Sequence, residues 1–427
     1  MALSSRGQIM ATPNNKYLLW DIIKDLWHPK TNPSGYLNLG VAENALLQET
    51  LLKHALENLD INITSLTYGD GPTGSRHTKT ILANFLTRYL HPVQLIEADH
   101  VTITNGCSAA VEHLSYLLCN PGSGILLGQP CFRGFRGFIE SRTDVKIVTV
   151  PFYSTDPFDS SAVSSYEAAI LRAKEQNTPI SALLLCNPHN PTGRCYTREA
   201  LIGLMRLCEN YKLHLISDEI YALSTWENHH DTFPPPTPFT SVLAIDTTDI
   251  IDPSRVHVVW GISKDFGSNG LRLGSIVSQV NPAVHRALVP IAGLSSCSSV
   301  TERITAKFLS DTVWVDAYTT ENRRLLAEKY AFMVSWAVQH GISYAPGGSA
   351  AFFFWVNLGA AYAKAHGLGE TTAVVEEELN AKLLARRVFV ADGSTFAAEE
   401  PGWFRITFAY DRGILEEGLR RITEVIQ

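Results

Sequence analysis

Short apolar runs alternate with longer amphipathic stretches through the middle of the chain. Runs rich in β-branched and aliphatic residues predict buried strands, and apolar residues repeated every three or four positions predict helices. Strands are expected at 101–104, 125–127, 145–150, 182–186, 213–216, 256–260 and 275–280. Helices are expected around 47–59 and 81–89 and at 109–119 and 197–211. This alternation predicts an α/β fold.

The C-terminal part of the chain has a different pattern. A helical stretch over 300–340 precedes apolar strands at 350–356 and 404–408, with a helix at 372–387 between them. A chain of 427 residues is long enough for two domains. We therefore expect an N-terminal arm at 1–39, with a helix at 17–27, that belongs to the small domain. The large domain is expected at 40–299 and the small C-terminal domain at 300–427.

Composition narrows the possible partners. The formal net charge of −7 is spread without a basic block, which disfavours nucleic acid as a partner. No apolar run reaches membrane-spanning length, and the first ten residues lack the apolar core of a signal peptide. The seven cysteines never form a CxxC pair, as expected of reduced thiols rather than disulfides or a metal site. These features predict a cytoplasmic protein without a metal.

The stretch 256–274 carries the most specific combination of chemical groups. Its apolar strand leads into a turn that contains Ser263 and Lys264, and Arg272 follows. A lysine at the end of a buried strand is poorly hydrated, so its pKa falls and its amine becomes a usable nucleophile. A guanidinium and a hydroxyl suit a phosphate. A lysine amine beside a phosphate-binding arginine can hold pyridoxal phosphate (PLP). A lysine and an arginine in a loop can equally be two solvated surface residues.

Polar side chains also lie directly after three other predicted strands, in the turns or at the starts of the helices that follow them. Ser108 lies in a turn at a helix start, where it either binds an anion or only caps the helix. Asn190 lies in a turn with two Asn-Pro steps and offers an amide to a bound oxygen. Asp218 follows a buried strand and needs a partner, such as a protonated pyridine nitrogen, and Tyr221 can donate to the same ring.

Three further residues are candidates for the site. Two of them have an alternative structural interpretation, and the third is a charged residue that needs a partner. Glu43 precedes a predicted helix, so it is either a helix-start charge or a substrate contact. Phe132 either stacks on a flat cofactor ring or packs in the core. Arg405 lies inside an apolar strand, where a substrate carboxylate is a natural partner for its charge.

The residues discussed above, taken in their order along the chain, resemble the site residues of fold-type I PLP-dependent enzymes, the aspartate aminotransferase superfamily. The resemblance covers nearly the whole chain. Within that family the chain is similar to the 1-aminocyclopropane-1-carboxylate (ACC) synthases. Its segment LGVAENALL resembles the motif GLAENQL of that branch. The segment SKDFGSNGLRLG resembles SKDLGLPGFRVG, and PGWFRITFA resembles PGWFRVCFA.

The resemblance implies an α/β fold with a mostly parallel central sheet flanked by helices, and a smaller α+β C-terminal domain. It also implies PLP as the cofactor and a homodimer with shared active sites, because Tyr68 resembles a tyrosine that reaches the neighbouring subunit's phosphate. Lys264 resembles the Schiff-base lysine, and the implied catalytic residues are Lys264, Tyr68 and Asp218. The implied cofactor contacts also include Gly106, Cys107, Ser108, Phe132, Asn190, Tyr221, Ser263 and Arg272. The implied substrate contacts are Arg405, Glu43, Gly40 and Asn190.

The activity that the resemblance implies is a PLP-dependent lyase acting on an α-amino acid. Conversion of S-adenosylmethionine (SAM) to ACC and methylthioadenosine is the first expectation. A C–S lyase acting on a cysteine conjugate and an aminotransferase are the alternatives. A non-catalytic regulatory domain of the same fold is disfavoured, because Lys264, Asp218 and Arg405 are all present.

Overall fold

The computed structural model describes residues 3–11, 18–57, 59 and 61–427, and its largest sheet within these residues has seven strands. In spatial order they are β2 (Val101–Thr104), β8 (Gly274–Val277), β7 (Val256–Gly261), β6 (His214–Asp218), β5 (Ile180–Cys186), β3 (Gly124–Gly128) and β4 (Lys146–Val150). Each predicted strand between residues 101 and 280 overlaps one of them. The last ends at Val277 rather than at residue 280, and β8 runs antiparallel to both of its neighbours.

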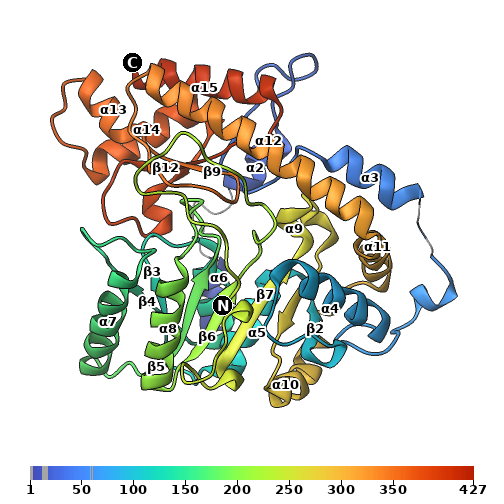
Figure 1. Cartoon of the computed structure of the whole chain (residues 1–427). Coiled ribbons are helices and arrows are strands. Elements are labelled where there is room, and N and C mark those ends of the chain that lie inside the picture. Colours follow the sequence, from blue (N-terminus) through green and yellow to red (C-terminus); the bar gives the residue numbers. More distant parts are fainter. Residues whose placement is uncertain (1–2, 12–17, 58, 60) are drawn as a thin grey trace.

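Helices cover both faces of this sheet (Figure 1). The helices between residues 48 and 310 are α3 (Gln48–Glu57), α4 (Arg76–Leu90), α5 (Gly106–Leu118), α6 (Gly134–Thr143), α7 (Val163–Glu175), α8 (Arg198–Tyr211), α9 (Ile262–Asp265), α10 (Pro282–Ala292) and α11 (Ser299–Ser310). Side-chain caps begin several of them: the Thr197 hydroxyl accepts a hydrogen bond from the Ala200 N–H at the start of α8. The cap sets where the periodic apolar face begins.

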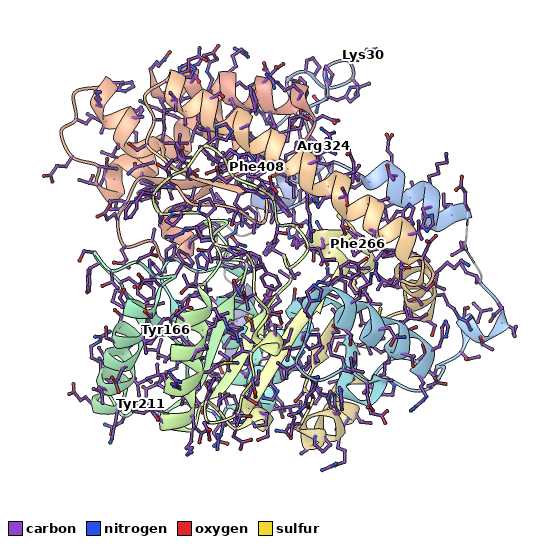
Figure 2. All side chains as sticks on the ribbon, in the orientation of Figure 1. Lys30, Tyr166, Tyr211, Phe266, Arg324 and Phe408 are labelled. Atoms are coloured by element: carbon purple, nitrogen blue, oxygen red, sulfur yellow. The ribbon has the colours of Figure 1, made fainter. Side chains whose placement is uncertain are left out.

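Alternate side chains of each strand enter different cores. Ile125 and Leu127 of β3 pack with α5 and α6, whereas Leu126 packs on the opposite face with α4, α7 and α8. Figure 2 shows side chains filling the space around the sheet, where Tyr166 and Phe266 are labelled, and the C-terminal part, where Phe408 is labelled. A sheet buried on both faces explains why its strands read as continuous apolar runs.

The C-terminal part is built on two small sheets. Its elements are α12 (Thr312–Gln339), β9 (Phe353–Asn357), α13 (Leu358–Ala365), α14 (Ala373–Ala385), β10 (Val388–Phe389), β11 (Ala391–Asp392), β12 (Trp403–Thr407) and α15 (Arg412–Ile426). β12 pairs antiparallel with β9 and β11, and β10 pairs parallel with β1 (Leu37–Asn38) near the N-terminus. The N-terminal segment therefore lies against the C-terminal part.

Two predicted helices differ from the structure. The expected helix at 300–340 is divided into α11 and α12, because the Asp311 carboxylate accepts a hydrogen bond from the Trp314 N–H and starts a new helix. The expected helix at 17–27 is shorter: α2 spans Leu18–Lys24, and residue 17 lies outside the described residues. A further helix, α1 (Ser5–Ala11), precedes it. None of the described helices is both long enough and apolar enough to cross a bilayer.

A buried carboxylate joins the loop after β6 to the C-terminal part. Asp231 accepts hydrogen bonds from the Tyr330 hydroxyl at 2.7 Å, the Tyr344 hydroxyl at 2.8 Å and the Gly347 N–H at 3.0 Å. Charge-assisted bonds of this kind are stronger than neutral ones. The loop at 229–239 is thus fixed to the C-terminal part through one buried residue.

A buried histidine makes the stability of the sheet dependent on pH. Burial lowers the pKa of His257 to about 3 from its usual 6.5, and His214 and Ser278 lie at 3.0 and 3.1 Å from its ring nitrogens. At pH values between these two pKa values, the His257 side chain binds a proton in the unfolded chain but not in the folded chain. The free energy of unfolding should therefore fall as the pH falls below about 6.5, by up to about 1.4 kcal/mol per pH unit. Urea unfolding at pH 7 and pH 5 measures it.

A substitution isolates this contribution. His257→Asn should make the loss of stability between pH 7 and pH 5 smaller than in the wild type, whereas His229→Asn, at an exposed position, should leave it unchanged. An equal loss in all three proteins would show that the charge state of His257 does not control acid stability.

Candidate active site

Lys264 lies on the short helix α9, which follows the fully buried strand β7. The sequence predicts a turn here, and this detail is wrong. The adjacent carboxylate of Asp265 is buried and accepts hydrogen bonds from the N–H groups of Leu223 and Ser224 at 3.1 and 3.0 Å. It also accepts one from the Trp260 indole at 3.0 Å. Because these bonds fix α9, they fix the backbone from which the lysine side chain extends.

Lys264 is half-buried, and polar groups surround its amine. Its Nζ donates to the Ala42 carbonyl at 2.5 Å and to the Asn269 side-chain oxygen at 3.4 Å. The Asn269 amide in turn donates to the Glu43 carboxylate at 3.3 Å. Burial, followed by the nearby charge of Arg405, lowers the pKa of Lys264 to about 8, while Glu43 opposes the shift. A substantial fraction of the amine is therefore neutral near physiological pH.

Sequence reasoning missed Asn269. The signal was present, because Asn269 stands where the motif SKDLGLPGFRVG has proline. An asparagine at this position adds a donor and an acceptor between Lys264 and Glu43 that proline cannot supply.

Asp218 is the last residue of β6 and is 5% exposed. One oxygen accepts a hydrogen bond from the Ile220 N–H at 3.3 Å, and no cationic side chain among the described residues lies within ion-pairing distance. Burial raises the pKa of Asp218 to about 7, against the attraction of Lys264. A cationic group bound beside this carboxylate would restore its charged form.

Arg405 lies in β12 and is only 1% exposed. Its Nη1 donates to the Asn190 side-chain oxygen at 2.8 Å, and its Nη2 donates to the Gly40 carbonyl at 2.6 Å. The rings of Phe353 and Phe396 lie 4.4 and 4.9 Å from its Cζ. Within the part of the chain that the structure describes, its Nε has no hydrogen-bond partner. A guanidinium with a spare donor suits a carboxylate.

Two aromatic residues lie in the same region as the buried charges. The Tyr221 hydroxyl accepts a hydrogen bond from the Asn190 amide at 3.4 Å, so Asn190 links Tyr221 to Arg405. Phe132 is half-buried and packs edge-on against Phe135, with ring centroids 5.4 Å apart. Its ring therefore has both core contacts and an accessible surface.

The start of α5 lies against a guanidinium. Gly106 begins the helix with a φ of 78°, and a Cβ atom at this position would collide with the Arg272 guanidinium. A Cβ on Gly274 would collide with the backbone of Gly106 and Cys107. Glycine is therefore needed at both positions for the helix start and Arg272 to approach each other. Helix N–H groups beside a guanidinium form a site that favours a phosphate.

The other predicted phosphate contacts lie on α5 and α9. Ser108 is half-buried in the first turn of α5, and Ser263 is buried on α9 beside Lys264. Burial raises the pKa of the Cys107 thiol well above its usual value, and Asp218 adds to this. Arg272 and Lys264 lower it. Cys107 thus lies within electrostatic range of the amine, the carboxylate and the guanidinium.

Two predicted site residues lie differently from the rest. Glu43 is not at a helix start, because α3 begins at Gln48, so the helix-start interpretation is wrong. It belongs to the loop that contacts Lys264 through Asn269. Tyr68 is 98% exposed and is not brought near the other residues within one chain.

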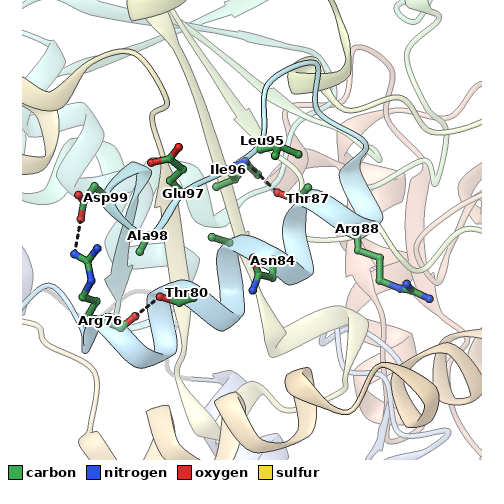
Figure 3. Close-up of a pocket in the computed structure, with 11 residues that line it drawn as sticks. Arg76, Thr80, Asn84, Thr87, Arg88, Leu95, Ile96, Glu97, Ala98 and Asp99 are labelled. Carbon is green, nitrogen blue, oxygen red and sulfur yellow. Dashed lines mark hydrogen bonds and ion pairs between the residues drawn. The ribbon is translucent and has the colours of Figure 1, made fainter.

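A separate depression of about 510 Å³ runs along α4 and the segment 95–99 (Figure 3). None of the predicted site residues lines it among the described part of the chain. Its polar groups bond to one another: Arg76 pairs with Asp99 at 3.3 Å, and the Ile96 N–H donates to the Thr87 hydroxyl at 3.0 Å. We assign it no ligand.

The buried cluster fits PLP. Among the residues that the structure describes, it has a partly neutral lysine amine, a buried carboxylate without a cationic partner, and a helix start beside a guanidinium. These features suit an aldehyde carbon, a pyridinium nitrogen and a phosphate, which are the three parts of this cofactor that a protein must hold.

Comparison with known proteins agrees with this arrangement. Residues 34–422 match the family model of class I and II aminotransferases. The chain is 31% identical over 413 residues to probable inactive ACC synthase-like protein 2 of Mus musculus, covering 94% of this chain and 68% of that protein. It is 33% identical over 400 residues to probable aminotransferase gliI of Aspergillus fumigatus, covering 91% of this chain and 89% of that protein. It is 32% identical over 447 residues to ACC synthase 6 of Oryza sativa, covering 99% and 79%.

Solved structures agree on the fold. An aspartate aminotransferase double mutant of Thermus thermophilus superposes with a TM-score of 0.78 at 20% identity, covering all of both chains. The aspartate aminotransferase of Thermotoga maritima gives a TM-score of 0.74 at 21% identity, covering 99% of each chain. The predicted fold class, with a large central sheet flanked by helices and a smaller C-terminal sheet, is confirmed.

Members of this family depend in general on PLP, are typically homodimers and act on amino-acid substrates. The chain belongs to the class I and II aminotransferases, with the fold-type I architecture of PLP-dependent enzymes, and lies close to the ACC synthase-like proteins.

Proposed function

We propose that the protein is a PLP-dependent lyase that acts on an α-amino acid. The observation that carries the proposal is the half-buried Lys264, whose Nζ donates to the Ala42 carbonyl at 2.5 Å and whose pKa is lowered to about 8 by burial and by the nearby Arg405. A general base for a Cα proton and a clamp for the adjacent carboxylate must lie close together. In support, the charge of Arg405 acts on the Lys264 amine.

We assign the cofactor contacts as follows. Lys264 would hold PLP covalently, and the Asp218 carboxylate would accept a hydrogen bond from the protonated pyridine nitrogen. Asn190 and Tyr221 contact the ring oxygen, and Phe132 packs on the ring. The phosphate contacts are Gly106, Cys107, Ser108, Ser263 and Arg272, with Tyr68 of the partner subunit. The support for these roles is the fit between charge and burial described above.

Arg405 binds the substrate α-carboxylate, with Asn190 and the Gly40 carbonyl holding the guanidinium in place. The Lys264 amine, once free of the cofactor, removes the Cα proton as a general base. PLP supplies an acceptor for the electron pair that the broken C–H bond leaves behind. Glu43, linked to Lys264 through Asn269, lies on the substrate side and assists the departure of the side-chain group.

The relatives favour two versions of the chemistry. The rice relative is named an ACC synthase, which favours SAM as the substrate and ACC with methylthioadenosine as the products. The fungal relatives are named probable aminotransferases, which supports amino-group transfer as the second candidate. A C–S lyase acting on a cysteine conjugate uses the same Lys264 and Arg405 roles with a different leaving group.

The cofactor assignment predicts a covalent adduct at one lysine. The purified protein incubated with PLP should gain a visible absorption band, and borohydride should fix PLP on the peptide that contains Lys264. Lys264→Ala should form no adduct and lose turnover by at least about a hundredfold. Lys79→Ala is the matched control. Burial also lowers the pKa of Lys79, but its Nζ donates to the Thr73 hydroxyl and contacts none of the proposed cofactor residues among the described part of the chain. Peptide mass spectrometry locates the adduct.

The rate of PLP uptake should also depend on the pKa of this amine. Only the neutral amine attacks, so the rate should rise with pH through about 8 rather than through 10.5. A covalent adduct on another residue, with none on Lys264, would rule out the assignment.

The shared-site assignment predicts complementation between subunits. Tyr68→Ala and Lys264→Ala should each be inactive, and mixing them should restore activity to about a quarter of the wild-type value. Half of the randomly formed dimers are mixed, and each mixed dimer has one intact site. Tyr153→Ala, at another exposed tyrosine, should keep full activity by itself. If verified mixed dimers stay inactive, Tyr68 does not act across the interface.

Product analysis tests the reaction. Methylthioadenosine and ACC from SAM would support the first version, and pyruvate with ammonia from a cysteine conjugate would support C–S cleavage. Glu43→Gln should lower turnover while leaving the absorption of bound PLP unchanged, whereas Glu49→Gln, exposed on α3, should change neither. Mass spectrometry of the products gives the result. Transfer of the amino group to a 2-oxo acid, with no cleavage of SAM or conjugates, would replace the lyase assignment with an aminotransferase.

A further inference from the structure

Arg133 places a second guanidinium next to the proposed carboxylate clamp. It follows Phe132 and is half-buried at the start of α6. Its Cζ lies 5.9 Å from the centre of the Phe389 ring. The same ring packs against Gly40, whose carbonyl accepts a hydrogen bond from Arg405. The Phe389 ring therefore lies near both Arg133 and the backbone carbonyl that accepts from Arg405.

Within the described residues, the charge of Arg133 has no ion-pair partner. Burial lowers the pKa of its guanidinium, and Asp392 provides only a weaker opposing attraction. The Asp392 carboxylate is already used, because it accepts hydrogen bonds from Ser394 and from the Thr395 N–H. Arg405 is also close enough for the two positive charges to repel each other.

Helix stability does not explain this arginine. Arg133 is the N-cap residue of α6, where a positive charge opposes the helix macrodipole, and its side chain makes no capping bond. Two repelling guanidinium groups with few local partners are unfavourable in the folded chain alone. A bound molecule with two negative groups would offset both charges, with one group beside Arg133 and the other at the unpaired Nε of Arg405.

We propose that Arg133 binds an acidic group on the side chain of the substrate, so that the enzyme prefers an α-amino acid with a second carboxylate or a similar anion. The inference rests on the proposed function, in which Arg405 binds the α-carboxylate. It also bears on the leaving group. The sulfonium of SAM carries a positive charge that Arg133 repels, whereas an acidic thioether conjugate carries a charge that it attracts. Within the lyase chemistry, Arg133 favours the conjugate.

Dicarboxylate binding tests the inference without turnover. The PLP-loaded protein is titrated with succinate and with butyrate, which have the same number of carbons but two and one carboxylates, and binding is followed by calorimetry. The wild type should bind succinate about tenfold to a hundredfold more tightly. Arg133→Gln should lose most of this preference while binding butyrate unchanged, and Arg133→Lys should keep part of it. Arg136→Gln, which removes an exposed arginine on the same helix that pairs with Glu140, should keep the full preference.

The outcomes separate the two proposals. A wild type that binds PLP but shows no preference for succinate overturns the inference alone, as does an Arg133→Gln protein that keeps the wild-type preference. A wild type that takes up no PLP overturns the proposed function and the inference with it. The absorption of bound PLP in each variant shows whether the site has kept its structure.

Discussion

The burial of one guanidinium connects the three parts of the chain that form the site. Arg405 comes from a strand of the C-terminal sheet, Asn190 from the turn after β5, and Gly40 from the N-terminal segment that pairs with β10. A buried charge is tolerated only when hydrogen bonds hold it, so the three segments must meet at fixed distances. Any relative shift of one segment would leave the guanidinium with fewer partners.

The same N-terminal loop also controls the lysine. The Ala42 carbonyl accepts from the Lys264 amine, and the Gly40 carbonyl accepts from Arg405, so a loop of a few residues contacts the proposed base and the proposed clamp. Because these carbonyls are backbone groups, their positions depend on the pairing of β1 with β10 rather than on local side chains. The spacing between base and clamp is thus set by a contact between the two ends of the chain.

The sequence predicted the central strands and the residues at their ends, because burial on both faces produces apolar runs that end where polar chemistry begins. It did not predict that α9 would be helical or that Asp231 would fix a loop, since both depend on partners distant in the sequence. Asn269 differs from these two, because its replacement of the motif's proline was visible in the sequence, although its contacts with Lys264 and Glu43 were not. The surroundings of Arg133 also depend on residues distant in the sequence. The Tyr68 side chain is almost fully exposed in one chain, so its role stays a prediction.

Asp218 has an evolutionary consequence. A buried carboxylate without a cationic partner lowers the stability of the ligand-free fold, so many apolar replacements at this position would stabilise a chain that had no use for it. Random mutation would then remove the residue without opposition from selection. Under the proposed function, the bound cofactor would offset this cost. Lineages that abandon catalysis should lose such charged positions early, and the mammalian relatives named probable inactive offer a natural set in which to look for that erosion.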